Sequence, residues 1–118
     1  MTSILPEVDK KAMLENEELG SSVVESFHVS LKHSADGWVD DDMAFISPWG
    51  FDLSEIKAKV FLYHGSLDLM VPYTHGQWLA KNIPSEYLTE HLIEGEGHIS
   101  IWIEHMGNML KELASLRP

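Results

Sequence analysis

The feature of this sequence that most constrains its fold is a pair of short apolar runs, at residues 60–63 and 87–93, each followed by a polar loop that contains glycine. The first run, Val-Phe-Leu-Tyr, has apolar side chains on both faces, which is typical of a strand covered on both sides in a parallel sheet. Between the runs, apolar residues recur at helical spacing until Pro84, which ends a helix: Trp78, Leu79 and Ile83. The succession of strand, helix and strand predicts a right-handed βαβ unit.

Asp68 and His98 lie in the loops that follow the two predicted strands. Because both strands of a βαβ unit run in the same direction, their loops leave at one edge of the sheet, and we expect the two side chains to lie side by side. Imidazole takes and returns a proton near neutral pH, and it does so best when a carboxylate holds its other ring nitrogen. Gly65, Gly95 and Gly97 would allow sharp turns and close backbone approach here. The two loops therefore predict an acid and base pair.

The amino-terminal segment, residues 6–32, is rich in helix formers and predicts helices with one apolar face. The residues of that face are Val23, Val24, Phe27 and Leu31. The sequence Gly20-Ser21-Ser22 predicts a break between two helices. Alternation of Phe27, Val29 and Leu31 leaves a strand as an alternative for the end of this segment.

A turn cluster at residues 33–37 is expected to precede a short helix over 38–46. Its first turn would hold Asp40, Asp41 and Asp42 near the positive end of the helix dipole. After a loop at 47–51, Asp52 is expected to cap a short helix before the first strand. The tail from 99 to 116 predicts an amphipathic helix. Its apolar residues are Ile99, Ile103, Met106, Leu110, Leu113 and Leu116.

Composition narrows the class of protein. A length of 118 residues predicts one domain. Eight Lys and Arg against nineteen Asp and Glu give a net charge of −11, which disfavours nucleic acid and anionic membrane surfaces as partners. The chain has no cysteine, its amino end does not resemble a signal peptide, and it has no apolar stretch of roughly 20 residues. We therefore expect a soluble cytoplasmic protein.

The residues after position 37 resemble the carboxyl-terminal part of the α/β-hydrolase fold. The resemblance rests on residues 60–72, on the motif at 94–98, and on Trp78-Leu79-Ala80 between them. Residues 37–42 and 48–53 are similar to the end of the lid that many members carry. The resemblance implies an α/β fold class, a partial α/β-hydrolase fold in which a βαβα unit with parallel strands near 60–64 and 87–93 follows lid-like helices. It divides the chain into a lid-like segment, 1–52, and a core segment, 53–118.

The resemblance also implies functional roles. Asp68 corresponds to the triad acid of the family and His98 to the general base, in the family's order of nucleophile, acid and base. The chain departs from the family pattern at the nucleophile, because none of its serines lies in a Gly-x-Ser-x-Gly motif and no HGGG-like oxyanion segment occurs. Lys59 is a smaller departure, since relatives often have proline before the strand.

Four residues are candidates for substrate binding: Trp38, Trp49, Phe51 and His64. The three aromatic residues would line an acyl pocket if they belong to the edge of a lid, with core packing as the alternative. His64 would approach a substrate from the first loop, with a hydrogen-bonded structural histidine as the alternative. Trp78 and Trp102 are expected to cover the sheet as core aromatics.

No metal site or cofactor is expected. Three consecutive aspartates at 40–42 in a helix point in different directions and cannot converge on one ion. His91, His98 and His105 are evenly spaced but fall on a strand, a loop and a helix, so their spacing has no geometric meaning.

Two functions remain open. The first is a hydrolase of esters, lactones or related acyl compounds, with the nucleophile supplied by a missing segment or another chain; an aspartate nucleophile also stays open. The second is a non-catalytic hydrolase remnant that serves as an interaction or oligomerisation module. The resemblance implies a hydrolase by ancestry, but alone the chain is expected to be inactive. The unpaired edge of the first strand predicts self-association or binding of an amino-terminal half.

Overall fold

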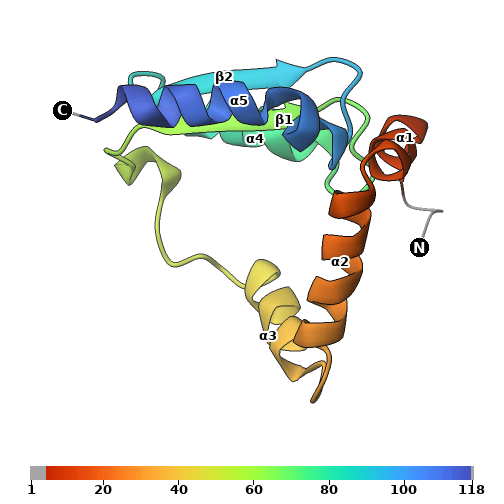
Figure 1. Cartoon of the computed structure of the whole chain (residues 1–118). Coiled ribbons are helices and arrows are strands. Elements are labelled where there is room, and N and C mark those ends of the chain that lie inside the picture. Colours follow the sequence, from red (N-terminus) through yellow and green to blue (C-terminus); the bar gives the residue numbers. More distant parts are fainter. Residues whose placement is uncertain (1–4, 118) are drawn as a thin grey trace.

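The computed structural model describes residues 5–117 and shows a mixed α/β protein (Figure 1). Over this range the elements are the helices α1 (Glu7–Glu15), α2 (Glu17–Ser30), α3 (Asp36–Phe45), α4 (Tyr73–Asn82) and α5 (Ser100–Ser115), the short 3₁₀ helix η2 (Leu53–Glu55), and the strands β1 (Val60–Gly65) and β2 (Leu88–Ile93). The α/β class and the predicted order of strand, helix, strand and helix from residue 60 onward are confirmed.

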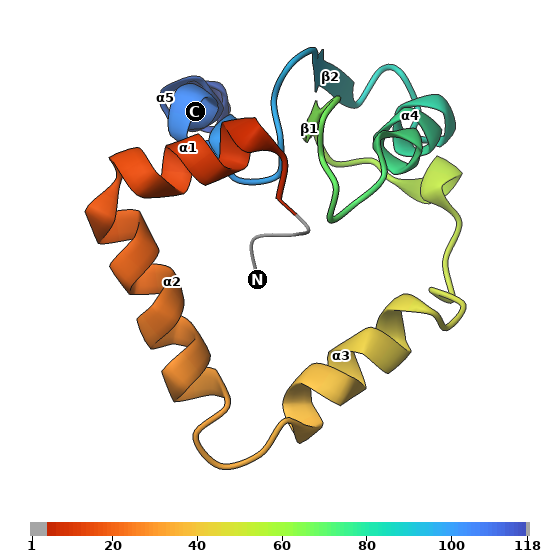
Figure 2. The same ribbon diagram turned by 90° about the vertical axis from the view of Figure 1, so that its right-hand side faces the viewer.

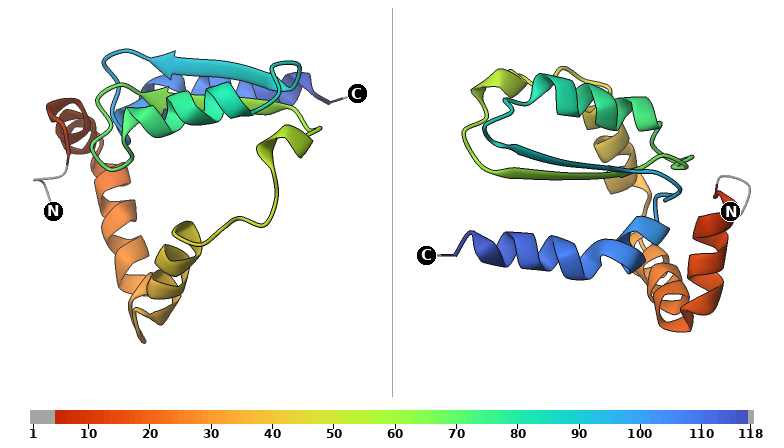
Figure 3. Two further views of the ribbon diagram at one scale, coloured as in Figure 1. Left: turned by 180° about the vertical axis from the view of Figure 1, so that it is seen from behind. Right: turned by 90° about the horizontal axis from the view of Figure 1, so that it is seen from above.

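The two strands are parallel neighbours, paired in register from Val60 with Leu88 to Gly65 with Ile93. Helix α4 connects them and packs against both strands, and α5 follows β2 and packs against β1. The two helices lie on opposite sides of the sheet (Figures 2 and 3). This arrangement brings the ends of β1 and β2, with the loops that follow them, to one edge of the sheet.

The amino-terminal helices differ from the prediction in where they break. The break lies at Asn16, not at Gly20-Ser21-Ser22, which falls inside α2. Asn16 explains the boundary because its side chain accepts a hydrogen bond from the Leu19 amide, 3.0 Å away, and so caps α2. The strand alternative for residues 27–31 is wrong, since α2 stays helical to Ser30.

Helix α3 begins two residues earlier than predicted, at Asp36, and this shifts the acidic run out of its first turn. Asp36 is the acidic residue of that turn, and its amide donates to the Ser34 hydroxyl. The placement of Asp40, Asp41 and Asp42 in the first turn is therefore wrong. The predicted cap at Asp52 is confirmed, because its carboxylate accepts from the Ser54 amide at the start of η2.

The buried core of the described residues is small. Its apolar members are Leu5, Leu53, Ile83 and Ile101. Most residues of β1 are half-buried, so the strand is less fully covered than its sequence predicted. Trp78 and Trp102 are each 53% exposed, which contradicts their prediction as core aromatics. A sheet of two strands is too narrow to cover the inner faces of both flanking helices.

The molecule is consequently open. Helices α2 and α3 extend away from the sheet, and a long connection returns from α3 to β1 (Figures 1 and 2). The radius of gyration is 16.3 Å, against about 13.5 Å for a compact chain of this length. The accessible surface is 8871 Å², against about 6,500 Å² for a compact protein of this mass. Between residues 5 and 117, no helix is long and apolar enough to cross a membrane.

Candidate active site

The loops after β1 and β2 are joined to each other directly. The Ser66 amide donates to the Ile93 carbonyl at 2.9 Å, and the Leu67 amide donates to the Glu96 carbonyl at 2.8 Å. Gly65 makes this approach possible, because a Cβ atom there would collide with the backbone of Glu96 and Gly97. Gly95 has a φ of 87°, a conformation that favours glycine. Both loops thus depend on glycine to reach the same place.

Asp68 and His98 meet at this edge, as the βαβ topology requires. The Nδ1 atom of His98 lies 2.8 Å from Oδ2 of Asp68, and the side chain of Asp68 is only 6% exposed. The other carboxylate oxygen, Oδ1, accepts from the amides of Met70 and Val71, each at 2.8 Å. Asp68 is therefore fixed by its own turn and points one oxygen at the imidazole.

The protonation of this pair follows from its contacts. Burial of Asp68 acts to raise the pKa of its carboxyl, but the hydrogen bonds from the Val71 amide, the His98 ring and the Met70 amide outweigh burial and lower that pKa below its ordinary value. An ionised Asp68 accepts the Nδ1 proton of His98, which leaves Nε2 of the neutral ring unprotonated. No described residue hydrogen-bonds Nε2. The His98 side chain is 40% exposed, so Nε2 is available to a reacting group.

His64 lies beside this pair but is held as a structural residue. Its Nε2 is 3.1 Å from the Val71 carbonyl, to which it donates, and 3.8 Å from Oδ2 of Asp68. A Cβ atom on Gly76 of α4 would strike the His64 ring, so helix and ring are in close contact. These contacts favour the structural alternative over a direct role in substrate binding.

A groove of about 480 Å³ runs from the Asp68–His98 pair along β1 and α5. Apolar side chains form most of its walls, including Phe61, Ile101 and Trp102, and Lys59 lies at the amino-terminal end of β1. His64 contributes to this lining. The groove therefore offers an apolar path that ends at an acid and base pair.

The three aromatic candidates from the lid-like segment do not line this groove. Trp49 stacks on Phe51 at 5.8 Å between ring centroids and meets Trp78 of α4 edge-on at 6.3 Å. Trp38 stacks on Phe27 where α2 and α3 meet. The structure thus groups these residues with each other and with α2 or α4, not with Asp68 and His98. Their assignment to substrate binding stays a prediction.

Asp9 is the site residue that the sequence did not reveal. It lies on α1, its side chain is completely buried, and its carboxylate accepts hydrogen bonds from the amides of His98, Ile99 and Ser100 at 2.8–3.0 Å. In sequence it is one of several acidic residues in a helical segment. One signal in the sequence indicates that α5 needs a cap from elsewhere. Ile99 stands at the N-cap of α5 and has no side-chain oxygen to cap the helix.

A second polar cluster lies between β1, β2 and α5. Glu112 accepts from the Tyr63 hydroxyl at 2.7 Å and from His91 Nε2 at 2.9 Å, and the Tyr63 and His91 rings stack at 4.2 Å. Burial, together with the hydrogen bond to Glu112 and its charge, raises the pKa of Tyr63 to about 12. The cluster links α5 to both strands, and its Tyr63 also lines the groove.

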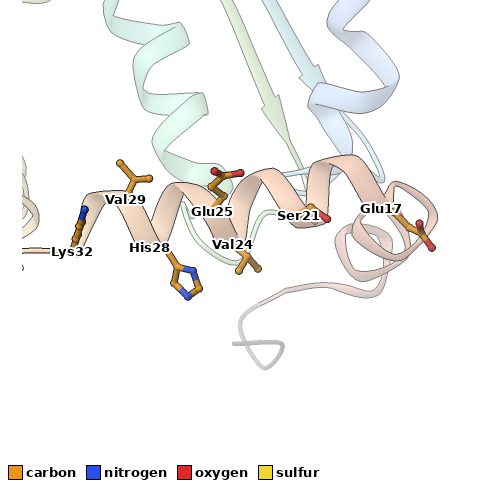
Figure 4. Close-up of a pocket in the computed structure, with 8 residues that line it drawn as sticks. Glu17, Ser21, Val24, Glu25, His28, Val29 and Lys32 are labelled. Atoms are coloured by element: carbon orange, nitrogen blue, oxygen red, sulfur yellow. The ribbon is translucent and has the colours of Figure 1, made fainter.

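A hollow of about 850 Å³ lies along α2. Its lining residues all fall between Glu17 and Lys32. They share one half of the helix surface, but Glu25 and Val29 point to one side of it and Val24 and His28 to the other, so the side chains diverge (Figure 4). The hollow is therefore open space beside one helix, with no second element to close it.

Among residues 5–117, no group of three or more His, Asp or Glu side chains is arranged to hold a metal ion. No protein family, curated protein or solved structure matches this chain.

Proposed function

We propose that this chain is the part of an α/β-hydrolase-type enzyme that carries the acid and the base, acting on esters, lactones or related acyl compounds. The observation that supports this proposal is the 2.8 Å hydrogen bond between His98 Nδ1 and a buried, ionised Asp68. The bond fixes the tautomer in which Nε2 is a base, and the apolar groove beside it suits the acyl part of a substrate.

In the proposed reaction, His98 Nε2 takes a proton from a hydroxyl nucleophile as its oxygen attacks the substrate carbonyl. Asp68 stabilises the imidazolium that forms. The same proton then passes from Nε2 to the leaving oxygen as the acyl bond breaks, and water completes the cycle by the same two steps. No serine of the chain lies in a nucleophile motif, so the hydroxyl would come from another segment or chain. With an aspartate nucleophile, His98 would instead activate the water.

A second candidate function is an interaction or oligomerisation module. It is favoured by the apolar face of α5, on which Ile103, Met106, Leu110, Leu113 and Leu116 are 39–58% exposed. The accessible surface exceeds that of a compact protein by about 2,400 Å², more than one partner buries in a standard interface. A second copy of this chain, or a chain that supplies the rest of a sheet, would cover this surface. The net charge of −11 argues against nucleic acid and anionic membranes as that partner.

Hydrolysis of p-nitrophenyl acetate tests the proposed role of His98, because this activated ester reacts with a positioned imidazole even without a serine nucleophile. His75→Ala is the matched control, since His75 is an exposed histidine on α4. We expect His98→Ala to remove most of the rate above buffer and His75→Ala to remove little. Equal losses in the two variants would contradict the proposal, because any exposed histidine would then account for the rate.

Light scattering of the wild type tests the second candidate function, an oligomerisation module. A monomer at micromolar concentration would exclude self-association.

A further inference from the structure

Asp9 occupies an unusual position for a carboxylate. It is fully buried where α1 packs against α5, and burying an ionised group is unfavourable unless hydrogen bonds and local dipoles compensate for lost water. Three backbone N–H groups in succession supply that compensation, at the positive end of the α5 dipole. The first of these three belongs to His98. The carboxylate is therefore attached to the residue proposed as the base.

The two oxygens of Asp9 have different partners. Oδ1 accepts from Ile99 at 3.0 Å and from Ser100 at 2.8 Å, and so caps the helix. Oδ2 accepts from the His98 amide at 2.9 Å, one residue before the N-cap of α5. One half of the carboxylate thus serves the helix and the other half serves His98.

Gly97 shows that the loop is fitted to this carboxylate. A Cβ atom at position 97 would collide with both carboxylate oxygens of Asp9. The Gly97 amide meanwhile donates to the Ser100 hydroxyl at 2.9 Å. The backbone just before His98 therefore has no room for a side chain, because Asp9 fills that space.

We infer that Asp9 is a positioning residue for His98: it fixes the backbone of His98, while Asp68 fixes its ring. The significance of this role rests on the proposed function of His98 as the base. The ring reaches Asp68 only if the backbone stays in place, and a displacement of about 1 Å is enough to disrupt a catalytic geometry. A helix 89 residues earlier in the chain thus controls the alignment of the proposed base.

Asp9→Asn separates this role from simple helix capping. The asparagine carbonyl oxygen can keep both hydrogen bonds of Oδ1, to Ile99 and Ser100. Its NH₂ group replaces Oδ2 and then faces the His98 N–H, so that two donors oppose each other. The variant is expected to free His98 while α5 remains capped. Asp52→Asn is the matched control, because Asp52 also caps a helix, the short η2, and its carboxylate accepts from Ser54 and not from His98.

The experiment is an NMR comparison of the full chain and these two variants. Amide exchange of His98 should become about tenfold or more faster in Asp9→Asn, whereas that of Ile99 and Ser100 should change less than about threefold. The Nδ1–H signal of His98, which reports the bond to Asp68, should weaken or vanish. Asp52→Asn should change neither. An unchanged His98 amide and ring in Asp9→Asn would overturn the inference. If the wild type itself lacked the Nδ1–H signal, the proposed function would fail instead.

Gly97→Ala keeps the test decisive if Asp9→Asn does not fold. The added methyl group must displace the Asp9 carboxylate, so the same loss of the His98 ring signal is expected. A Gly97→Ala chain that kept the wild-type His98 ring signal would show that the Asp9 carboxylate does not hold the loop in place, and would overturn the inference.

Discussion

Gly65→Ala offers the sharpest test of how the two loops meet. The new Cβ would collide with the Glu96 carbonyl and would lie only 2.8 Å from the Gly97 carbonyl oxygen, so the second loop must move away by about 1 Å. That movement breaks two hydrogen bonds, the one from the Leu67 amide to Glu96 and the one from the Gly95 amide to the Ser66 hydroxyl. Two lost hydrogen bonds cost about 2 kcal/mol and overpacking adds about 1–3 kcal/mol, so the free energy of unfolding should fall by about 3–5 kcal/mol.

Urea unfolding followed by circular dichroism measures this change. With a slope of about 2 kcal/mol per M, the midpoint should fall by about 2 M. Gly107→Ala is the matched control: Gly107 lies on the exposed part of α5 with open space around it, so alanine there should stabilise the helix by up to about 1 kcal/mol. The same substitution thus has opposite signs at the two glycines. A Gly65→Ala chain as stable as the wild type would refute the close approach of the loops.

Three other outcomes are expected. Hydrogen bonds lower the pKa of Asp68 in the folded chain, so its contribution to stability is present above about pH 4 and is lost as the pH falls through the folded-state pKa. When the urea midpoint is plotted against pH, the wild type should therefore lose stability on the acid side. Asp68→Asn should make this loss smaller. Glu112→Gln should lower the pKa of Tyr63 from about 12 towards 10. The shift should be partial, because burial of the ring is the larger cause and remains. Near-ultraviolet titration of tyrosinate measures the pKa, and an unchanged titration would contradict the pairing of Tyr63 with Glu112. Replacing the exposed Leu110 and Leu113 of α5 with lysine should reduce the mass measured by light scattering if this face associates, and unchanged assembly would place the interface elsewhere.

The βαβ unit could be predicted from sequence because its signals are local and agree with each other. The apolar run that begins at Val60, the break at Pro84 and the glycine-containing loops each indicate the same topology, and parallel pairing then places Asp68 next to His98. The break between the first two helices could not be predicted in the same way. A glycine is the usual signal for such a break, but its cost inside a helix is only about 1 kcal/mol, and the cap at Asn16 determined the boundary.

Asp9 and the two exposed tryptophans show where sequence patterns stop being informative. A helix cap normally comes from the residue at the helix start, and nothing in the pattern around Ile99 indicates that the cap comes from another helix far away in the chain. Trp78 and Trp102 lie on helices whose spacing predicts a buried face. Whether such a face is buried depends on how much sheet lies beneath it, which the helix sequence does not encode.

The loop between β2 and α5 is held by more hydrogen bonds than a simple connection between two elements needs. The amides of Gly95, Gly97 and His98 donate to the side chains of Ser66, Ser100 and Asp9, and the Glu96 carbonyl accepts from the first loop. A connecting loop needs few such bonds because water can satisfy its backbone. Holding His98 before any ligand binds is what a preorganised base requires. The oligomerisation function assigns no role to the orientation of His98, so this fixed loop supports the proposed role of His98 as a base over that second candidate.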